Sequence, residues 1–126
     1  MAQPEMQDFN NNLKKRAKEF AIKICFSLKN VPYNPVSREL ISQLVRSSTS
    51  VSANFSSATR ARSSAEYYSK LCIVVEECDE TEHWLDLMIA SELVPAKDYE
   101  PLRKEAYELL CIFSSVRRKI RKDLGK

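Results

Sequence analysis

Apolar residues recur at helical spacing in four stretches of the chain, which prolines and short polar segments separate. These stretches cover about residues 8–29, 37–58, 64–93 and 98–122. The connections between them are short, and short connections join antiparallel neighbours in helical bundles. We therefore expect one all-α domain over residues 1–126, folded as an antiparallel up-down four-helix bundle.

The third stretch carries the clearest bundle seam. Its apolar positions follow an unbroken 4-3-4-3 spacing, through Tyr67, Leu71, Val74, Cys78, Thr81, Leu85 and Met88. Further apolar residues widen this face, with Ile73 and Trp84 on one side and Tyr68, Val75 and Ile89 on the other. Either this helix packs on two sides within one chain, or it buries a second surface against another copy. We favour the second explanation, which predicts self-association with Ile73 and Trp84 at the oligomer interface.

Local signals mark the helix ends and one unusual segment. Ser37 is expected to cap the second helix, and Ser63 to Glu66 form the capping-box pattern that opens the third. Residues 47–58 are almost all small, which is typical of a flexible linker or of a helix that a neighbour approaches closely. Val51 and Phe55 keep helical spacing through this segment, and that favours the helix.

The composition excludes several kinds of active site. The only glycine, Gly125, lies near the end of the chain, so no glycine-rich phosphate loop can be built. With one histidine, His83, neither a site of several histidines nor the paired Glu-x-x-His motifs of di-metal bundles can form within one chain. We therefore predict no catalytic residues, no metal site, no cofactor and no enzymatic activity.

Two further observations concern the compartment. The four cysteines have no Cys-x-x-Cys spacing, and we interpret them as reduced, partly buried thiols. The longest apolar run is far too short to span a membrane. We expect a cytoplasmic protein with no membrane contact.

Charge is distributed unevenly along the chain. Residues 1–62 carry a net charge of +6, residues 63–100 carry −8 and residues 101–126 carry +5. Basic patches bind nucleic-acid phosphates, although basic faces are often simply solvated, and cations near a helix C-terminus also complement its dipole. Six residues are our candidate phosphate contacts: Arg60, Arg62, Arg117, Arg118, Arg121 and Lys122.

Several segments, taken in order, resemble a known family. They are residues 43–55, 60–63, 66–67, 70–81 and 84–85. Together they resemble the bacterial four-helix bundle proteins related to the 23S rRNA intervening-sequence protein family, over roughly residues 38–120. The accessory variability proteins of diversity-generating retroelements are relatives of that family. The resemblance implies a four-helix bundle that assembles as a ring-like homopentamer and binds nucleic acid.

The resemblance also implies a set of signature polar positions, namely Arg46, Asn54, Arg60, Arg62 and Glu80. We expect an ion pair between Arg46 and Glu80, and hydrogen bonds from a buried Asn54 that fix helix register. One common version of the pattern reads Asn-Ile-Ala-Glu-Gly where this chain has residues 54–58, so the acid and the glycine of that version are missing here.

The sequence thus predicts a non-enzymatic homo-oligomer, a pentamer by resemblance, that binds RNA or DNA through basic patches. The alternative is a protein-interaction scaffold or accessory subunit that binds a protein partner and does not contact nucleic acid directly.

Overall fold

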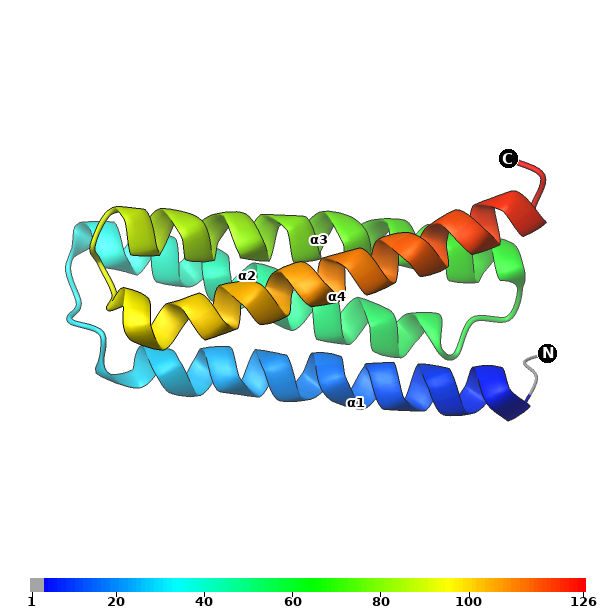
Figure 1. Ribbon diagram of the computed structural model, residues 1–126, viewed down its shortest axis with the longest axis horizontal. Helices are drawn as coiled ribbons and strands as arrows, with labels where there is room; N and C mark the ends of the chain where they lie inside the picture. Colours follow the sequence, from blue (N-terminus) through cyan, green and yellow to red (C-terminus); the bar gives the residue numbers. More distant parts are fainter. Residues whose placement is uncertain (1–3) are drawn as a thin grey trace.

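Four long helices make up the regular structure of the computed structural model, which describes residues 4–126 (Figure 1). They are α1 (Pro4–Ser27), α2 (Pro35–Ala58), α3 (Ser64–Ala90) and α4 (Ala96–Asp123), with a short 3-10 helix, η1 (Leu28–Asn30), after the first. Consecutive helices run in opposite directions (Figure 1). Within residues 4–126 no strand occurs, and the prediction of an all-α fold with four helices is confirmed.

The helix ends differ from the expected positions for local reasons. The first helix starts at Pro4 rather than near residue 8, and its final residues tighten into η1. The second starts at Pro35, because Asn34 and not Ser37 is its cap. The Asn34 side chain accepts hydrogen bonds from the backbone N–H groups of Val36 and Ser37, both at 2.9 Å. Ser37 Oγ accepts from the Asn34 N–H at 2.8 Å, which completes a reciprocal capping box.

The last two helices also differ slightly from expectation. As predicted, Ser63 caps α3, its hydroxyl accepting from the Glu66 N–H at 3.1 Å. This helix ends at Ala90, three residues before the expected limit, and Glu92 then adopts a left-handed backbone with a φ of 59°. The fourth helix starts at Ala96 and ends at Asp123, one or two residues beyond each predicted limit.

Large apolar side chains from all four helices form the core. Phe20, Phe55 and Phe113, from three different helices, are each at most 1% exposed. The rings of Phe55 and Phe113 pack with centroids 5.1 Å apart. This burial provides most of the driving force that holds the helices together.

The small-residue segment of α2 is helical throughout, as Val51 and Phe55 indicated. Ser47 and Ser48 are completely buried within it. Thr81 of α3, also fully buried, donates a hydrogen bond to Ser47 Oγ at 2.9 Å. Small side chains therefore let α2 and α3 approach closely and pair their hydroxyl groups.

Helix α3 lies between α2 and α4 and packs extensively against both. Its wide apolar face is largely used within the chain: Val75 is buried, and Tyr68, Trp84 and Ile89 are half-buried. Ile73 remains 40% exposed. Packing on two sides in one chain thus accounts for most of this face, so its width no longer requires a second copy.

Candidate nucleic-acid interface

The up-down topology brings two distant basic segments to one end of the bundle. The connection between α2 and α3 lies at the same end as the C-terminus of α4 (Figure 1). The amino group of Lys126, 5.3 Å from the centroid of the Tyr68 ring, shows that the end of the chain approaches the start of α3. We call the cations gathered here the basic end: Arg60, Arg62, Arg117, Arg118, Lys119, Arg121 and Lys122.

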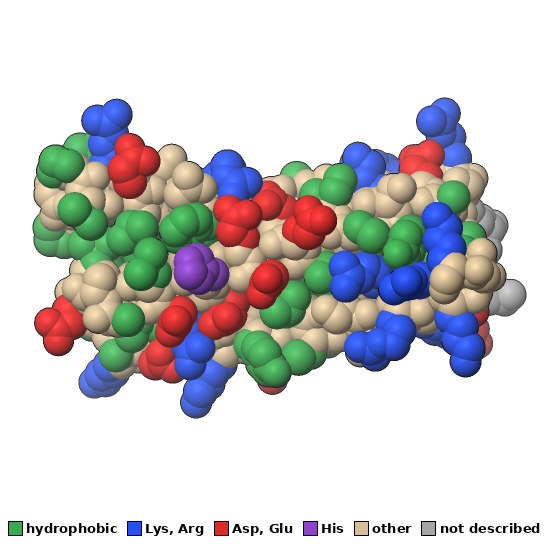
Figure 2. Space-filling view, turned by 90° about the horizontal axis from the view of Figure 1, so that it is seen from above, with side chains coloured by type: hydrophobic (Ala, Val, Ile, Leu, Met, Phe, Trp, Pro, Cys, Tyr) green, Lys and Arg blue, Asp and Glu red, His purple; other side chains and the backbone are tan. Residues whose placement is uncertain are grey.

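Lys and Arg side chains are concentrated toward this end of the molecule, whereas Asp and Glu side chains gather nearer the middle (Figure 2). Charge that alternates along the sequence is thus separated along the long axis of the fold. A polyanion that approaches this face meets its strongest attraction at the basic end.

Most cations of the basic end are free of carboxylate partners. Among residues 4–126 no acidic oxygen lies within 4.0 Å of any charged nitrogen between Arg117 and Lys122. Arg60 donates to Ser56 Oγ at 3.0 Å, and Arg62 lies 3.6 Å from Glu66 in a contact exposed to solvent. Arg121 and Lys122 also stand in the last turn of α4, where they complement the helix dipole. These charges remain available for phosphates.

Arginines nearer the middle of the bundle are used differently. Arg16 of α1 donates to both carboxylate oxygens of Glu105 on α4 at 2.8 Å. Hydrogen bonds from this guanidinium hold the pKa of the Glu105 carboxyl below its ordinary value. Arg103 of α4 similarly donates to Glu82 of α3 at 2.9 Å. These pairs join neighbouring helices and leave the arginines occupied.

Two of the signature positions meet across α2 and α3. Arg46 contacts Glu80 and also Glu77, the latter at 2.8 Å. Trp84, predicted at the oligomer interface, donates from Nε1 to the same Glu80 carboxylate at 3.2 Å. The indole is therefore half-buried against its own chain, and Ile73 is the more accessible of the two predicted interface residues.

The expectation for Asn54 is wrong. Its side chain is half-buried, and Nδ2 donates to the carbonyl oxygen and the hydroxyl of Ser50 at 3.0 and 2.9 Å, one turn earlier in α2. The amide is satisfied on the preceding turn, and within residues 4–126 it forms no hydrogen bond to another helix. Two buried hydrogen bonds that do join helices run from Thr81 to Ser47 and from Tyr67 to Asn10, both at 2.9 Å. The only sequence signal for them was the polar oxygen of Thr81 and Tyr67 within an apolar seam.

The residues considered for other chemistry lie apart. His83 is exposed on α3. In residues 4–126 no three His, Cys, Asp or Glu side chains gather as a metal site would need. Cys78 is buried, which raises the pKa of its thiol to about 12, whereas Cys25 and Cys111 are exposed, contrary to the expected partial burial. No helix in this part of the chain has the length and apolar character required to cross a bilayer.

Comparison with known proteins identifies the family. The model of the 23S rRNA-intervening sequence protein family matches residues 10–115. The chain belongs to this family. The resemblance read from the sequence is thereby confirmed. The matched range includes Arg46, Asn54, Arg60, Arg62 and Glu80 and ends just before the basic turns of α4.

A crystal structure of a protein of unknown function from the S23 ribosomal protein family of Bacteroides thetaiotaomicron is similar to this member of the 23S rRNA-intervening sequence protein family. The similarity covers 86% of this chain and 97% of that one, with 31% sequence identity and a TM-score of 0.75. A search of curated proteins finds no match.

Proposed function

We propose that this chain is a non-enzymatic homo-oligomeric bundle, a ring-like pentamer by its resemblance, that binds RNA or DNA through the basic end. The observation that carries the proposal is that the α2–α3 connection and the last turns of α4 lie at the same end of the bundle. The five Lys and Arg side chains between Arg117 and Lys122 have no acidic partner within residues 4–126. The family description, which refers to 23S rRNA, favours RNA as the first ligand to test.

Phosphate binding suits this arrangement on physical grounds. Arg118 and Lys122, one turn apart, are both exposed, so the two charges reach the solvent side by side. Contact with phosphates releases condensed counterions, and this gain needs no base-specific contact. In an oligomer the basic end is repeated once per copy, and simultaneous engagement of several copies raises the avidity.

The test is a salt series of binding measured by fluorescence anisotropy, with an RNA hairpin and a DNA duplex in parallel. The variant is Arg118→Gln/Lys122→Gln. Its matched control, Lys97→Gln/Lys104→Gln, removes the same charge from exposed positions on the same helix. Lys104 and Lys122 are separated by about 27 Å at the rise of an α-helix.

We expect wild type and control to show the same dependence of log K on log salt. Loss of two phosphate contacts at the basic end should reduce the magnitude of that slope by about 1.4 to 1.8 for each copy that engages the nucleic acid. Absence of binding at low salt, or equal effects of the two variants, contradicts the proposal. An oligomer that fails to bind either nucleic acid would instead point to the protein-interaction scaffold.

A further inference from the structure

Helices α1 and α4 separate toward the basic end. At the opposite end the Tyr99 hydroxyl donates to the Ser27 carbonyl oxygen at 2.8 Å, and nearer the middle Arg16 donates to Glu105. From there α4 diverges from α1 toward its C-terminus (Figure 1). A cleft of about 370 Å³ lies between the first turns of α1 and the last turns of α4. We call it the α1–α4 cleft, and its lining residues are Glu5, Met6, Phe9, Val116, Lys119 and Ile120.

The cleft is apolar on both walls. Val116 and Ile120, one turn apart on α4, are half-buried and form one wall. Phe9, on the α1 wall, is 42% exposed. The next residue, Asn10, is buried and accepts a hydrogen bond from Tyr67 at 2.9 Å, which fixes this turn of α1 against α3. The Phe9 ring is therefore an accessible apolar surface on a fixed backbone.

The two walls differ in charge. Lys119 lines the cleft from α4, and residues 117–123 of that helix carry five cations and a single acid. Lys119 is exposed and, among residues 4–126, has no carboxylate oxygen within 4.0 Å. Glu5 lines the cleft from α1 and repels anions at that wall. An anionic ligand must therefore place its charge along α4 and an uncharged, apolar part between the walls.

We propose that the α1–α4 cleft receives an unpaired base of a nucleic-acid strand, with the Phe9 ring stacked against the base. The adjoining phosphate lies over Lys119, and the strand continues across the basic end. Proteins hold single strands by this combination, because every base has a face that stacks on an aromatic ring and every nucleotide carries a phosphate. A base within a duplex is already stacked and paired, so a duplex offers this cleft only its phosphates. The inference rests on the nucleic-acid binding of the proposed function and adds that unpaired strands are the preferred ligand.

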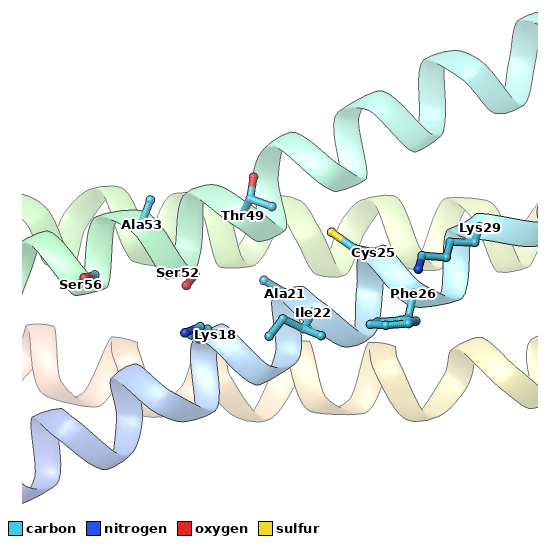
Figure 3. A pocket seen from close by; sticks show the side chains of 10 residues that line it. All are labelled: Lys18, Ala21, Ile22, Cys25, Phe26, Lys29, Thr49, Ser52, Ala53 and Ser56. Atoms are coloured by element: carbon cyan, nitrogen blue, oxygen red, sulfur yellow. The ribbon is translucent and has the colours of Figure 1, made fainter.

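A second exposed phenylalanine lacks this setting. Phe26 lies in a groove between α1 and α2, about 26 Å from Phe9 at the rise of an α-helix (Figure 3). It is 63% exposed, but the amino group of Lys29 stands over its ring, 4.0 Å from the centroid. The groove lies away from the basic end, and its cations are Lys18 and Lys29. Phe26 is therefore a matched control, because it is the same residue type on the same helix with a larger exposed fraction.

The test compares two ligands by fluorescence anisotropy at low salt: a short unstructured RNA of adenosine and cytidine, and the same strand annealed to its complement. Phe9→Ala should weaken binding of the single strand by about 5- to 150-fold for each copy that engages it, as expected for the loss of one base–aromatic stack. Binding of the duplex should stay unchanged, because the phosphate contacts remain. Phe26→Ala should bind both ligands as wild type does. Phe9→Tyr keeps an aromatic ring and should retain wild-type binding of the single strand.

A salt series separates stacking from charge. Phe9→Ala removes no charge, so its slope of log K against log salt for the single strand should equal that of wild type, with lower affinity at every salt concentration. Lys119→Gln should reduce the magnitude of that slope by about 0.7 for each engaged copy. A slope that changes in Phe9→Ala contradicts a stacking role for the ring.

The failures are distinguishable. A wild-type protein that binds neither ligand at low salt removes both this inference and the proposed function. Equal losses in Phe9→Ala and Phe26→Ala, or equal losses of strand and duplex binding in Phe9→Ala, remove this inference alone. Light scattering after size-exclusion chromatography checks a further outcome: if Phe9→Ala loses a wild-type oligomer, a second copy of the chain occupies the cleft and the inference is overturned. Circular dichroism should show unchanged helix content in Phe9→Ala, because the ring is exposed.

Discussion

Replacing Ser47 by leucine tests the close approach of α2 and α3. Ser47 is completely buried, and its hydroxyl accepts a hydrogen bond from Thr81 of the neighbouring helix at 2.9 Å. A leucine is much larger than the buried serine that it replaces at this helix contact. The helices must separate or neighbouring side chains must leave their preferred rotamers, and overpacking of this kind costs about 1 to 3 kcal/mol. Loss of the buried hydrogen bond adds about 1 kcal/mol.

Urea unfolding followed by circular dichroism measures the total loss of stability from overpacking and from the missing hydrogen bond. With a denaturant dependence of about 2 kcal/mol per molar for a domain of this size, a loss of about 2 to 4 kcal/mol lowers the midpoint by about 1 to 2 M. Ser42→Leu is the matched control, because it makes the same change at an exposed position of α2. It should change stability by no more than a few tenths of a kcal/mol. All samples need one protein concentration, since self-association makes the apparent stability concentration-dependent.

Ser47→Ala separates the two contributions. The Glu77 carbonyl oxygen lies 2.8 Å from Thr81 Oγ1, so the single hydroxyl proton of Thr81 can be donated there when the serine oxygen is removed. We expect a loss of about 1 kcal/mol or less. If Ser47→Leu unfolds at the wild-type midpoint, α2 and α3 are not closely packed there and the reasoning fails.

Three further predictions concern the core, the ion pairs and the buried thiol. Phe113→Ala should cost about 3 to 5 kcal/mol in the same assay, and a cost below about 1 kcal/mol would contradict its complete burial. Arg46→Met should lower the free energy of unfolding by at most about 1 kcal/mol despite the contacts with Glu77 and Glu80, because the Arg46 side chain is half exposed. This loss should shrink in about 1 M salt, which screens exposed charges. A loss that does not depend on salt would contradict a screened ion pair. Burial raises the pKa of Cys78 to about 12, so an unfolded thiol ionises first and stability should fall between about pH 9 and pH 12, by at most about 1.4 kcal/mol per pH unit. Cys78→Ala should lose less over that interval, and identical pH profiles for the two proteins would refute the assignment.

The helices could be predicted from the spacing of apolar residues and from capping residues, because both signals depend only on the local sequence. The seam of α3 was visible because a spacing of three and four residues brings side chains to one face whatever the neighbours are. The start of α2 was misplaced because Pro35 looked like a break. A proline at the first helical position loses nothing, since its missing N–H would have no partner there. Asn34 before it could then act as the cap.

Features that depend on which helices are neighbours were harder to predict. The sequence shows the cations at Arg60 and Arg62 and those near the end of α4, and their meeting follows once the connections alternate in direction. The exposure of Phe26 was not visible, because the same helical spacing assigns one face of α1 to the core and says nothing of how far α2 covers the rest. The prediction for Asn54 was wrong for a related reason. A polar side chain in a helix can form a hydrogen bond to the preceding turn as readily as to a partner helix.

Ion pairs are distributed unevenly along the long axis of the bundle. Near its middle, arginines such as Arg46 and Arg103 are held by carboxylates, and a phosphate that bound there would have to displace those carboxylates first. At the basic end the cations between Arg117 and Lys122 carry no such cost among the described residues.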